Sequence, residues 1–404
     1  MVNSPHLRPA YELDKSLIDF SEDITNVYGK SDIMKDEHDL NEIVQCYQTK
    51  VFPKLRLWEY FVMDTKSLLD QFRETIAKST VDQIKSMYED VNIAAMPLKD
   101  RANLLKNDAL YSIGNGVRFP KKIKTAIAID FIYQLCKAQN IDYSNINYMC
   151  REYEKILNEI NMEFYRTYDE DVAVIFQNIA NRARYLRLAG HGPRLGRICR
   201  EMPLVDVCFT VLPLNEVTKK HHPDSLVLAN NGWIWNADPL LDFAGPNSSA
   251  YLRREVIAWG DCVKLRYGQK RDDNPWLWDH MAEYTRTMAK LFHGFRIDNC
   301  HSTPIHLAQY LLDVGRRERP DLYVIAELFT GSEEKDILYV SKLGINSLIR
   351  EAMNAWDSFE LSRLAHRHGG QPAGKFFFLK DYKIKKNIYK RILIENTFLF
   401  VKKN

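Results

Sequence analysis

The stretch GFRIDNCHSTPIHLAQYLLDVGRRERPDLYVIAELFTGSEE (294–334) decides the fold that we expect for this chain. It opens with a short strand-like run and continues as a helix, which Thr303 is expected to cap and which ends before Pro320. The continuous apolar run LYVIAELF (322–329) is typical of a strand buried on both faces. The order strand, helix, strand therefore predicts two parallel strands joined by a helical crossover.

The segments on either side of this stretch extend the pattern. Downstream, SEEKDILYVSKLGINSLIREAMNAW (332–356) is expected to be helical throughout. Upstream, residues 38–190 show mostly helical periodicity, interrupted at Pro53. After Gly190, short apolar runs such as residues 205–214 predict strands and loops. The predicted fold class is therefore α/β, with a large helix-rich region before the parallel unit.

The composition is that of an ordinary globular protein and argues against several classes of function. The net charge of +3 is small, and we find no basic stripe with interleaved aromatic residues, so no nucleic-acid partner is expected. The seven cysteines are scattered and form no CxxC pair, which argues against a zinc site or a disulfide framework. The chain has no apolar signal-peptide core and no long apolar stretch, so we expect a cytoplasmic protein that does not span a membrane.

Two acidic residues, Asp298 and Glu327, stand at the ends of the two predicted parallel strands. Both are expected at the carboxyl-terminal edge of the sheet, where α/β barrels build their active sites. Because adjacent strands lie about 4.7–4.9 Å apart, the carboxyl groups can approach to about 5–5.5 Å, the separation of a retaining glycosidase. Inverting enzymes need roughly 6.5–9.5 Å, which neighbouring strand ends do not readily supply.

The neighbouring residues predict opposite protonation states for this pair. Arg296 would keep Asp298 ionised as a nucleophile. The apolar sequence around Glu327 predicts a desolvated side chain that stays protonated and donates to a leaving oxygen. A structural interpretation stays open, because Arg296 and Asp298 can form an ordinary ion pair on one face of a strand. Glu327 can likewise cap the following helix.

The same residues carry a family resemblance. GFRIDNCH (294–301) resembles the nucleophile motif of the α-amylase superfamily, and VIAEL (324–328) is similar to its general-acid strand. The strings DNCHSTP, AELFTGSEE, LGINSLIREAM and NGWIWNADPL resemble eukaryotic glycogen debranching enzymes in particular. The resemblance runs over residues 3–373. It implies a 4-α-glucanotransferase of glycogen breakdown, from a family whose members also hydrolyse α-1,6-linked glucose in a separate region.

The resemblance implies a role for each matched residue. Asp298 matches the nucleophile, Glu327 the general acid/base and Arg296 the partner of the nucleophile. The polar residues that follow, Asn299 and His301, are matched to sugar contacts. His301 lies one position short of the usual spacing, so a structural histidine is an equal alternative.

The resemblance also implies the ligands. The expected partners are glycogen and α-glucan oligosaccharides, with no metal or organic cofactor and no membrane. Trp233, one of five tryptophans between residues 233 and 278, is taken as the ring that stacks on glucan, the alternative being a ring in the core. Another α-amylase-type hydrolase or transferase stays open as a function, and so does a non-catalytic glucan-binding fragment.

The fold implied by the resemblance is a partial (β/α)8 barrel of the α-amylase type with a large helical insertion. Residues 1–200 are expected to form a helix-rich inserted domain, and residues 201–373 the rest of the insertion and the barrel part with the carboxylates. The third carboxylate of the superfamily finds no match, so we expect an inactive fragment. Residues 374–404, with eight lysines and one arginine against Asp381 and Glu395, are expected to be a disordered tail foreign to the family, a basic membrane-surface segment being the alternative.

Overall fold

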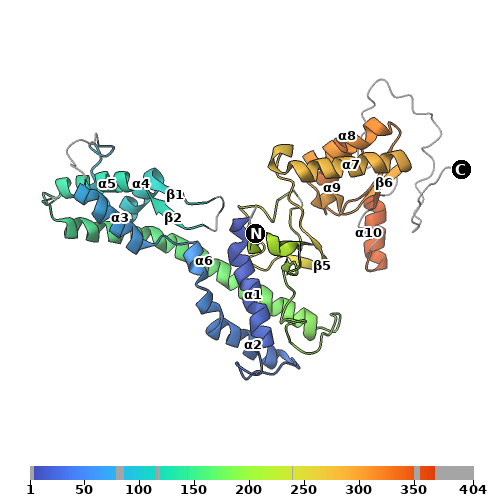
Figure 1. Ribbon diagram of the computed structural model, residues 1–404, viewed down its shortest axis with the longest axis horizontal. Coiled ribbons are helices and arrows are strands. Elements are labelled where there is room, and N and C mark those ends of the chain that lie inside the picture. The colour runs from blue at the N-terminus through green and yellow to red at the C-terminus, as the bar shows by residue number, and fades with distance from the viewer. Residues whose placement is uncertain are drawn as a thin grey trace. The chain divides into compact units, whose positions relative to one another are not determined.

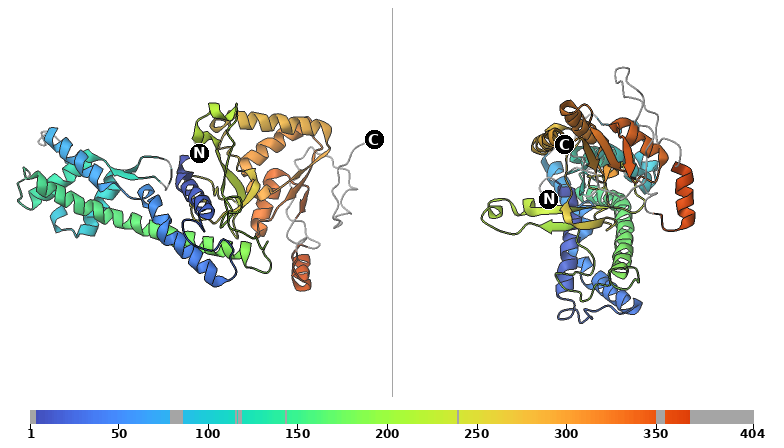
Figure 2. Two further views of the ribbon diagram at one scale, coloured as in Figure 1. Left: turned by 60° about the horizontal axis from the view of Figure 1, so that its bottom comes forward. Right: turned by 90° about the vertical axis from the view of Figure 1, so that its right-hand side faces the viewer.

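The structure, a computed structural model, describes residues 4–78, 86–114, 116, 119–142, 144–238, 240–349 and 355–368. The chain divides into two compact units (Figures 1 and 2). Unit 1 comprises Met1–Trp235 and Asp242–Lys264, and unit 2 comprises Asn236–Leu241 and Leu265–Asn404. The chain therefore passes between the units three times, because the short segment Asn236–Leu241 belongs to unit 2.

Unit 1 consists mainly of helices, with two small antiparallel sheets. Its α-helices are α1 (Arg8–Glu22), α2 (Glu37–Lys50), α3 (Thr65–Lys78), α4 (Leu98–Ala109), α5 (Thr125–Ala138) and α6 (Ile146–Arg187). Its short 3-10 turns are η1 (Pro5–Leu7), η2 (Phe52–Leu55), η3 (Leu57–Tyr60), η5 (Ile93–Ala95), η6 (Thr218–Lys220) and η7 (Pro223–Leu226). Strand β1 (Leu110–Ser112) pairs with β2 (Lys121–Ile123), and β4 (Val227–Trp233) lies between β3 (Phe209–Val211) and β5 (Ile257–Val263).

Helix α6 runs through both hydrophobic cores of unit 1 (Figure 1). It begins after Asn145, whose side chain accepts a hydrogen bond from a backbone N–H of the first turn, and its 42 residues extend over roughly 60 Å. The first half, including Tyr153 and Leu157, packs in a core with α3, α4 and α5. The second half, including Ile175 and Ile179, packs in a core with α1, α2 and β3.

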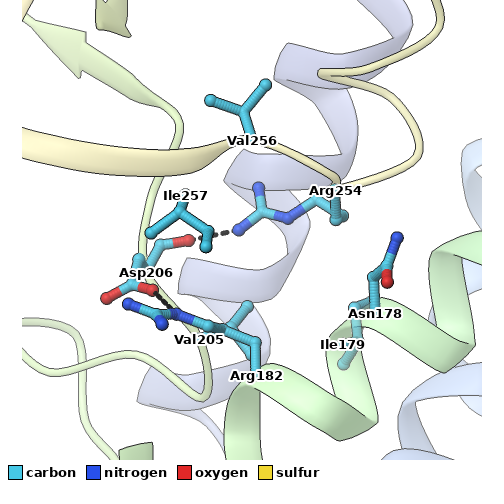
Figure 3. Close-up of a pocket in the computed structure, with 8 residues that line it drawn as sticks. All are labelled: Asn178, Ile179, Arg182, Val205, Asp206, Arg254, Val256 and Ile257. Atoms are coloured by element: carbon cyan, nitrogen blue, oxygen red, sulfur yellow. Dashed lines mark hydrogen bonds and ion pairs between the residues drawn. The ribbon is translucent and has the colours of Figure 1, made fainter. Parts of the chain in front are cut away.

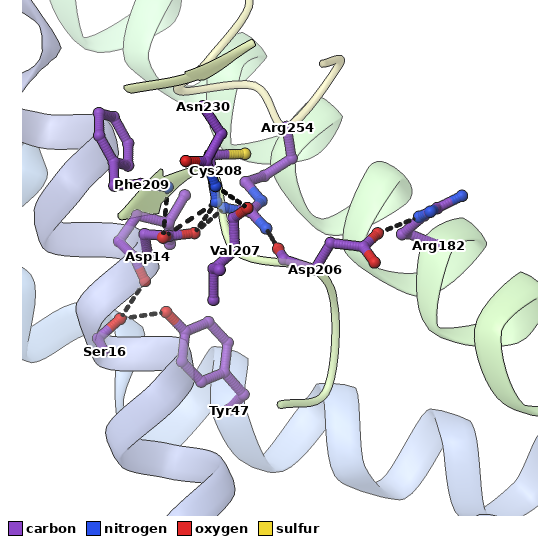
Figure 4. A network of polar contacts seen from close by, with 11 residues as sticks. Asp14, Ser16, Tyr47, Arg182, Asp206, Val207, Cys208, Phe209, Asn230 and Arg254 are labelled. Atoms are coloured by element: carbon purple, nitrogen blue, oxygen red, sulfur yellow. Dashed lines mark hydrogen bonds and ion pairs between the residues drawn. The ribbon is translucent and has the colours of Figure 1, made fainter. Parts of the chain in front are cut away.

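A buried network of polar contacts ties α1 to the loop before β3 (Figure 4). Asp14 of α1 accepts hydrogen bonds from the backbone N–H groups of Cys208 (3.0 Å) and Phe209 (3.2 Å). It is also paired with Arg254, whose other amino group donates to the carbonyl oxygen of Asp206. The Asp14 and Arg254 side chains are only 2% and 6% exposed, so this pair belongs to the interior of unit 1.

Unit 2 is a three-stranded parallel sheet with helical connections. Its elements are η8 (Arg271–Asp273), α7 (Pro275–Leu291), β6 (Gly294–Ile297), η9 (Cys300–Ser302), α8 (Ile305–Glu318), β7 (Tyr323–Glu327), α9 (Glu333–Leu343), β8 (Ser347–Ile349) and α10 (Ser358–His368). The strand order is β6-β7-β8, with α8 connecting the first pair and α9 the second. The register places Arg296 beside Ile325, and Ile325 beside Ser347.

The two faces of this sheet differ. Val324 and Ala326 of β7 are buried in a core with Leu312 of α8 and Leu343 of α9. Because side chains alternate along a strand, Glu327 projects from the opposite face. That face also carries the exposed Tyr323. The parallel β6–β7 pair and the mixture of helices and strands confirm the α/β expectation.

Several expectations about this unit are wrong. The segment 332–356 is not helical throughout, because Gly344 adopts a left-handed conformation (φ 62°) that ends α9, and β8 follows. Thr303 does not cap α8, since Pro304 occupies that position without a side-chain hydrogen bond. Strand β7 is buried on one face only within the described residues.

The expected partial (β/α)8 barrel is not confirmed, because the described strands form three separate sheets and no closed barrel. The predicted disordered tail, residues 374–404, lies outside the described residues.

Candidate active site

The carboxyl residues lie at the predicted strand ends. Glu327 is the last residue of β7, and Asp298 follows the last residue of β6. Since β6 and β7 are parallel and pair Ile297 with Ala326, Asp298 comes level with Glu327. Arg296 and Asp298 are two residues apart, so their side chains share the face that Glu327 occupies. The expected positions of the pair at the ends of adjacent parallel strands are therefore confirmed.

Arg296 connects the two carboxyl groups. Its Nη1 donates to Oδ1 of Asp298 (2.6 Å), and its Nη2 lies 3.5 Å from Oε2 of Glu327. Partial burial raises the pKa of Asp298, but the neighbouring Glu327 and the hydrogen bonds from Arg296 and Asn299 outweigh it and hold this pKa below its ordinary value. The Asp298 side chain is 64% exposed, so it remains open to a ligand.

Glu327 is more enclosed than Asp298, with 16% of its side chain exposed, yet its surroundings are polar. Besides the Arg296 guanidinium, the backbone N–H of Asn299 reaches its Oε2 at 3.0 Å. The apolar sequence neighbours Ala326 and Leu328 are buried in the helix-covered core. Alternation along the strand sends those neighbours to the opposite face, so sequence proximity overstated the apolar environment of Glu327.

Asn299 contacts both acidic side chains. Its backbone N–H donates to Glu327, and its side-chain Nδ2 donates to Oδ2 of Asp298 at 3.2 Å. Its φ of 46° lies in the left-handed region, which asparagine adopts more readily than most residues. The residue expected to contact sugar is thus joined to the carboxyl pair itself.

His301 is held by the loop after β7 and by α9. Its Nδ1 accepts a hydrogen bond from the backbone N–H of Phe329 (3.2 Å), and its ring stacks on the Phe329 ring at 5.9 Å between centroids. In a neutral imidazole the proton then resides on Nε2. The buried Tyr339 of α9 donates its hydroxyl to the His301 carbonyl oxygen at 2.9 Å. These contacts fix the backbone and the ring orientation of His301.

The sixth predicted residue belongs to unit 1. Trp233 ends β4, is 37% exposed, and lies with its ring 5.5 Å from that of Trp235. Trp235 and Trp276 are also exposed. Trp278 is buried and its indole N–H donates to a backbone carbonyl, which makes it a core residue. The five remaining predicted site residues are all in unit 2.

A cavity in unit 1 offers a weaker candidate (Figure 3). It measures about 30 Å³, enough for a water molecule, and is lined by Asn178, Ile179, Arg182, Val205, Asp206, Arg254, Val256 and Ile257. Arg182 and Asp206 already pair with each other across it.

Among the described residues, no cluster of acidic, histidine and cysteine side chains is arranged to hold a metal ion. None of their helices has the length and apolar character needed to cross a membrane.

Sequence reasoning missed the residues that support the site. Tyr339 is one, and Asn346 is another. The side-chain oxygen of Asn346 accepts a hydrogen bond from the backbone N–H of Val324 (2.8 Å). The backbone N–H of Asn346 donates to the carbonyl oxygen of Val324 (2.9 Å). Asn346 therefore joins β8 to β7. The signal in the sequence was Gly344, a typical helix-ending residue just before it.

Comparison with known proteins agrees with the resemblance. The sequence model of the family described as "Glycogen debranching enzyme, glucanotransferase domain" matches residues 1–323, which include Asp298. A glycogen debranching enzyme from Saccharomyces cerevisiae is 42% identical over 393 residues, covering 94% of this chain and 24% of that relative. The chain thus spans about a quarter of the length of the relative. With four-fifths of its residues matched, the chain belongs to the family of glucanotransferase domains of glycogen debranching enzymes.

Proposed function

We propose that this chain carries the 4-α-glucanotransferase centre of a glycogen debranching enzyme and that glycogen and α-glucan oligosaccharides are its substrates. The observation that carries the proposal is the pair Asp298 and Glu327, level with each other on one face of adjacent parallel strands and both contacted by Arg296. Asn299 also contacts both of them, through its backbone N–H to Glu327 and its side-chain amide to Asp298. Neighbouring strand ends favour the separation of about 5–5.5 Å of a retaining enzyme over the roughly 6.5–9.5 Å of an inverting one.

The first half of the reaction requires a nucleophile and an acid. Asp298, kept ionised by Arg296, attacks the anomeric carbon and forms a glycosyl ester as the glycosidic bond breaks. Glu327 donates its proton to the leaving 4-oxygen. The donors on Asp298, the Arg296 guanidinium and the Asn299 amide, support the role of an ionised nucleophile.

The second half reverses the roles. Glu327, now ionised, takes the proton of an acceptor 4-hydroxyl, whose oxygen attacks the anomeric carbon and releases the Asp298 carboxylate. The product is a lengthened α-1,4 glucan, and no metal or organic cofactor is needed for these steps. We propose His301 and Trp233 as sugar contacts, since the first presents a fixed ring and the second an exposed one.

We also propose that the sheet β6-β7-β8 is part of an α-amylase-type (β/α)8 barrel. Its helices cover one face, and the face with Glu327 would be the barrel interior. Residues 1–200 and the part of 201–373 that precedes the barrel strands would then form the inserted domain. The scattered cysteines, none of them paired among the described residues, support a cytoplasmic location.

Conversion of maltopentaose by a full-length debranching enzyme that contains this segment tests the function. We expect longer and shorter chains without net release of reducing ends, and we expect Glu327→Gln to abolish transfer while glucan binding persists. Asp279→Asn is the matched control, because Asp279 is an exposed carboxylate of the same unit that pairs with Arg271 and not with Arg296. Retention of about a tenth of the activity by Glu327→Gln would remove Glu327 from the acid/base role.

Net formation of reducing ends would instead identify a hydrolase. Glucan binding without turnover would identify a binding segment.

The isolated chain is proposed to lack transferase activity. The superfamily uses a third carboxylate that holds sugar hydroxyls as the ring distorts, and this sequence offers no match for it. Loss of one charged contact of ~3–4 kcal/mol slows chemistry by roughly two to three decades. Purified residues 1–404 should therefore leave maltopentaose unchanged under conditions where a full-length relative redistributes it. A comparable rate would contradict the proposal.

A further inference from the structure

Asn299 directs two donors at two different carboxyl groups. The side-chain amide contacts Oδ2 of Asp298, and the backbone N–H contacts Oε2 of Glu327. These two directions arise from one conformational feature, the left-handed φ of 46° immediately after the strand end. The φ of Asn299 sets the angle between its N–H and its side chain, so a different φ would break at least one of the two contacts. The contact depends on the backbone conformation as well as on the side chain.

The contacts on Glu327 are unequal for its two oxygens. Both described donors, the Asn299 N–H at 3.0 Å and Nη2 of Arg296 at 3.5 Å, lie near Oε2. A protonated carboxyl group has one accepting carbonyl oxygen and one hydroxyl oxygen. Donors near Oε2 favour it as the carbonyl oxygen, and the proton is then carried by Oε1.

We infer that Asn299 is a positioning residue that places the catalytic proton on Oε1 of Glu327 and holds Oδ2 of Asp298 for attack. The inference rests on the proposed function. When Glu327 is protonated, its Oε2 accepts from Asn299 while Oε1–H faces the leaving oxygen. After the proton has left, the same N–H stabilises the carboxylate until the acceptor hydroxyl returns a proton to Oε1.

This role differs from a sugar contact in its kinetic consequences. Loss of a sugar contact weakens substrate binding and raises KM, whereas loss of proton positioning lowers kcat. The dependence on leaving group is a second difference. Fluoride departs without protonation, so a defect confined to the acid should be small with an α-maltosyl fluoride donor.

Two substitutions separate the two donors of Asn299. Asn299→Gly keeps the backbone N–H and tolerates a positive φ, but removes the amide that holds Asp298. Asn299→Val also lacks the amide and strongly disfavours a positive φ. Because Tyr339 holds the nearby residue His301, the peptide before residue 299 must rotate instead, which turns its N–H away from Glu327. Both are made in a full-length debranching enzyme, with Asp279→Asn as the control and circular dichroism to verify folding.

The measurements are kcat and KM for maltopentaose, and the rate of fluoride release from α-maltosyl fluoride with azide as acceptor. Azide attacks the anomeric carbon of the glycosyl ester, breaks the ester bond and leaves Asp298 as carboxylate, so neither step needs the proton of Glu327. We expect Asn299→Gly to lower both rates equally, by about tenfold. Asn299→Val should lower kcat for maltopentaose by about a hundredfold with KM within about threefold, and fluoride release by only about tenfold.

The outcomes separate the inference from the function on which it rests. An unsubstituted enzyme that does not redistribute maltopentaose contradicts the proposed function. If it does redistribute maltopentaose, a raised KM with unchanged kcat in either variant overturns the positioning role in favour of a sugar contact. If Asn299→Val reduces the rates with maltopentaose and with α-maltosyl fluoride by the same factor, the proton assignment is overturned. Should Asn299→Val not fold, a selective loss on maltopentaose in Asn299→Gly overturns it as well, because that variant keeps the N–H.

Discussion

Among the arginine–aspartate pairs of the described residues, Asp14–Arg254 and Asp298–Arg296 have similar chemistry and opposite settings. In unit 1, Asp14 and Arg254 are almost fully buried, and the carboxylate also accepts two backbone hydrogen bonds. In unit 2, Asp298 and Arg296 are 64% and 42% exposed, and the arginine is shared between two carboxyl groups. The first cluster joins segments far apart in sequence, whereas the second joins two adjacent strand ends.

Burial acts on both charges of the unit 1 pair. It raises the pKa of Asp14 despite the Arg254 charge, while the pKa of Arg254 is itself raised because the neighbouring Cys208 and Asp14 outweigh desolvation. Burial therefore favours a neutral Asp14, whereas the charge of Arg254 favours an ionised one. The contacts of the carboxylate decide between these two states. Two backbone N–H groups and a guanidinium converge on its oxygens, which is the environment of an ionised carboxylate. We therefore treat the pair as a charged, internally satisfied structural link.

The comparison shows that the role of an ion pair depends on whether a ligand can reach it, more than on which residues form it. A buried carboxylate surrounded by protein donors has no remaining access for a ligand. The exposed Asp298 keeps that access, and its lowered pKa keeps it ionised. A mutation should consequently reduce stability in the first cluster and activity in the second.

The largest expected effect on stability is that of Asp14→Ala. This change leaves the Arg254 guanidinium buried without its carboxylate, and breaking a buried pair costs about 3–5 kcal/mol of the free energy of unfolding. Asp298→Asn should change the free energy of unfolding by less than about 1 kcal/mol, because the group is largely exposed. Urea denaturation of the chain, with hydrogen–deuterium exchange to separate the two units, measures both.

A matched control for Asp14→Ala lies on the same helix. Glu22 of α1 pairs with Arg200 in an exposed position, so Glu22→Ala should cost less than about 1 kcal/mol. Equal destabilisation by Asp14→Ala and Glu22→Ala would show that burial does not distinguish the clusters.

The sequence predicted the exposed cluster and not the buried one. Asp298 and Glu327 could be placed because strand ends and side-chain alternation are local properties of short segments. Asp14 and Arg254 are separated by 240 positions, and no local pattern relates them. Strand β8 was missed for another reason, because its apolar residues continue the helical spacing of α9 and only Gly344 marks the boundary.

An intermediate effect is expected when each arginine is replaced by lysine. A lysine ammonium keeps the charge but cannot donate in two fixed directions. Arg254→Lys should lower the free energy of unfolding by about 1–3 kcal/mol, because the Asp206 carbonyl and the Asp14 carboxylate cannot both be contacted. Arg296→Lys should leave stability within about 1 kcal/mol but reduce kcat of a full-length enzyme by about tenfold or more.

Measurements of the free energy of unfolding and of kcat can contradict the expectation that Arg254 serves stability and Arg296 serves activity. A strong loss of stability in Arg296→Lys, or an unchanged stability in Arg254→Lys, would reverse the assignments of structural and functional clusters.

The smallest expected effect is the pH dependence contributed by Asp298. Its pKa in the folded chain lies below the ordinary value of 3.8, so the folded state holds the ionised form more strongly than the unfolded state does. The resulting stabilisation is complete above the unfolded pKa and is lost as the pH falls through the lowered folded pKa. The difference in free energy of unfolding between the unsubstituted chain and Asp298→Asn should thus be constant above about pH 5 and shrink below about pH 4. Because the side chain is exposed, the whole change should stay below about 1 kcal/mol. This difference is measured by urea titrations at several pH values, with hydrogen–deuterium exchange of the β6 amides reporting on unit 2. If the difference grows as the pH falls, Asp298 is not held ionised by Arg296.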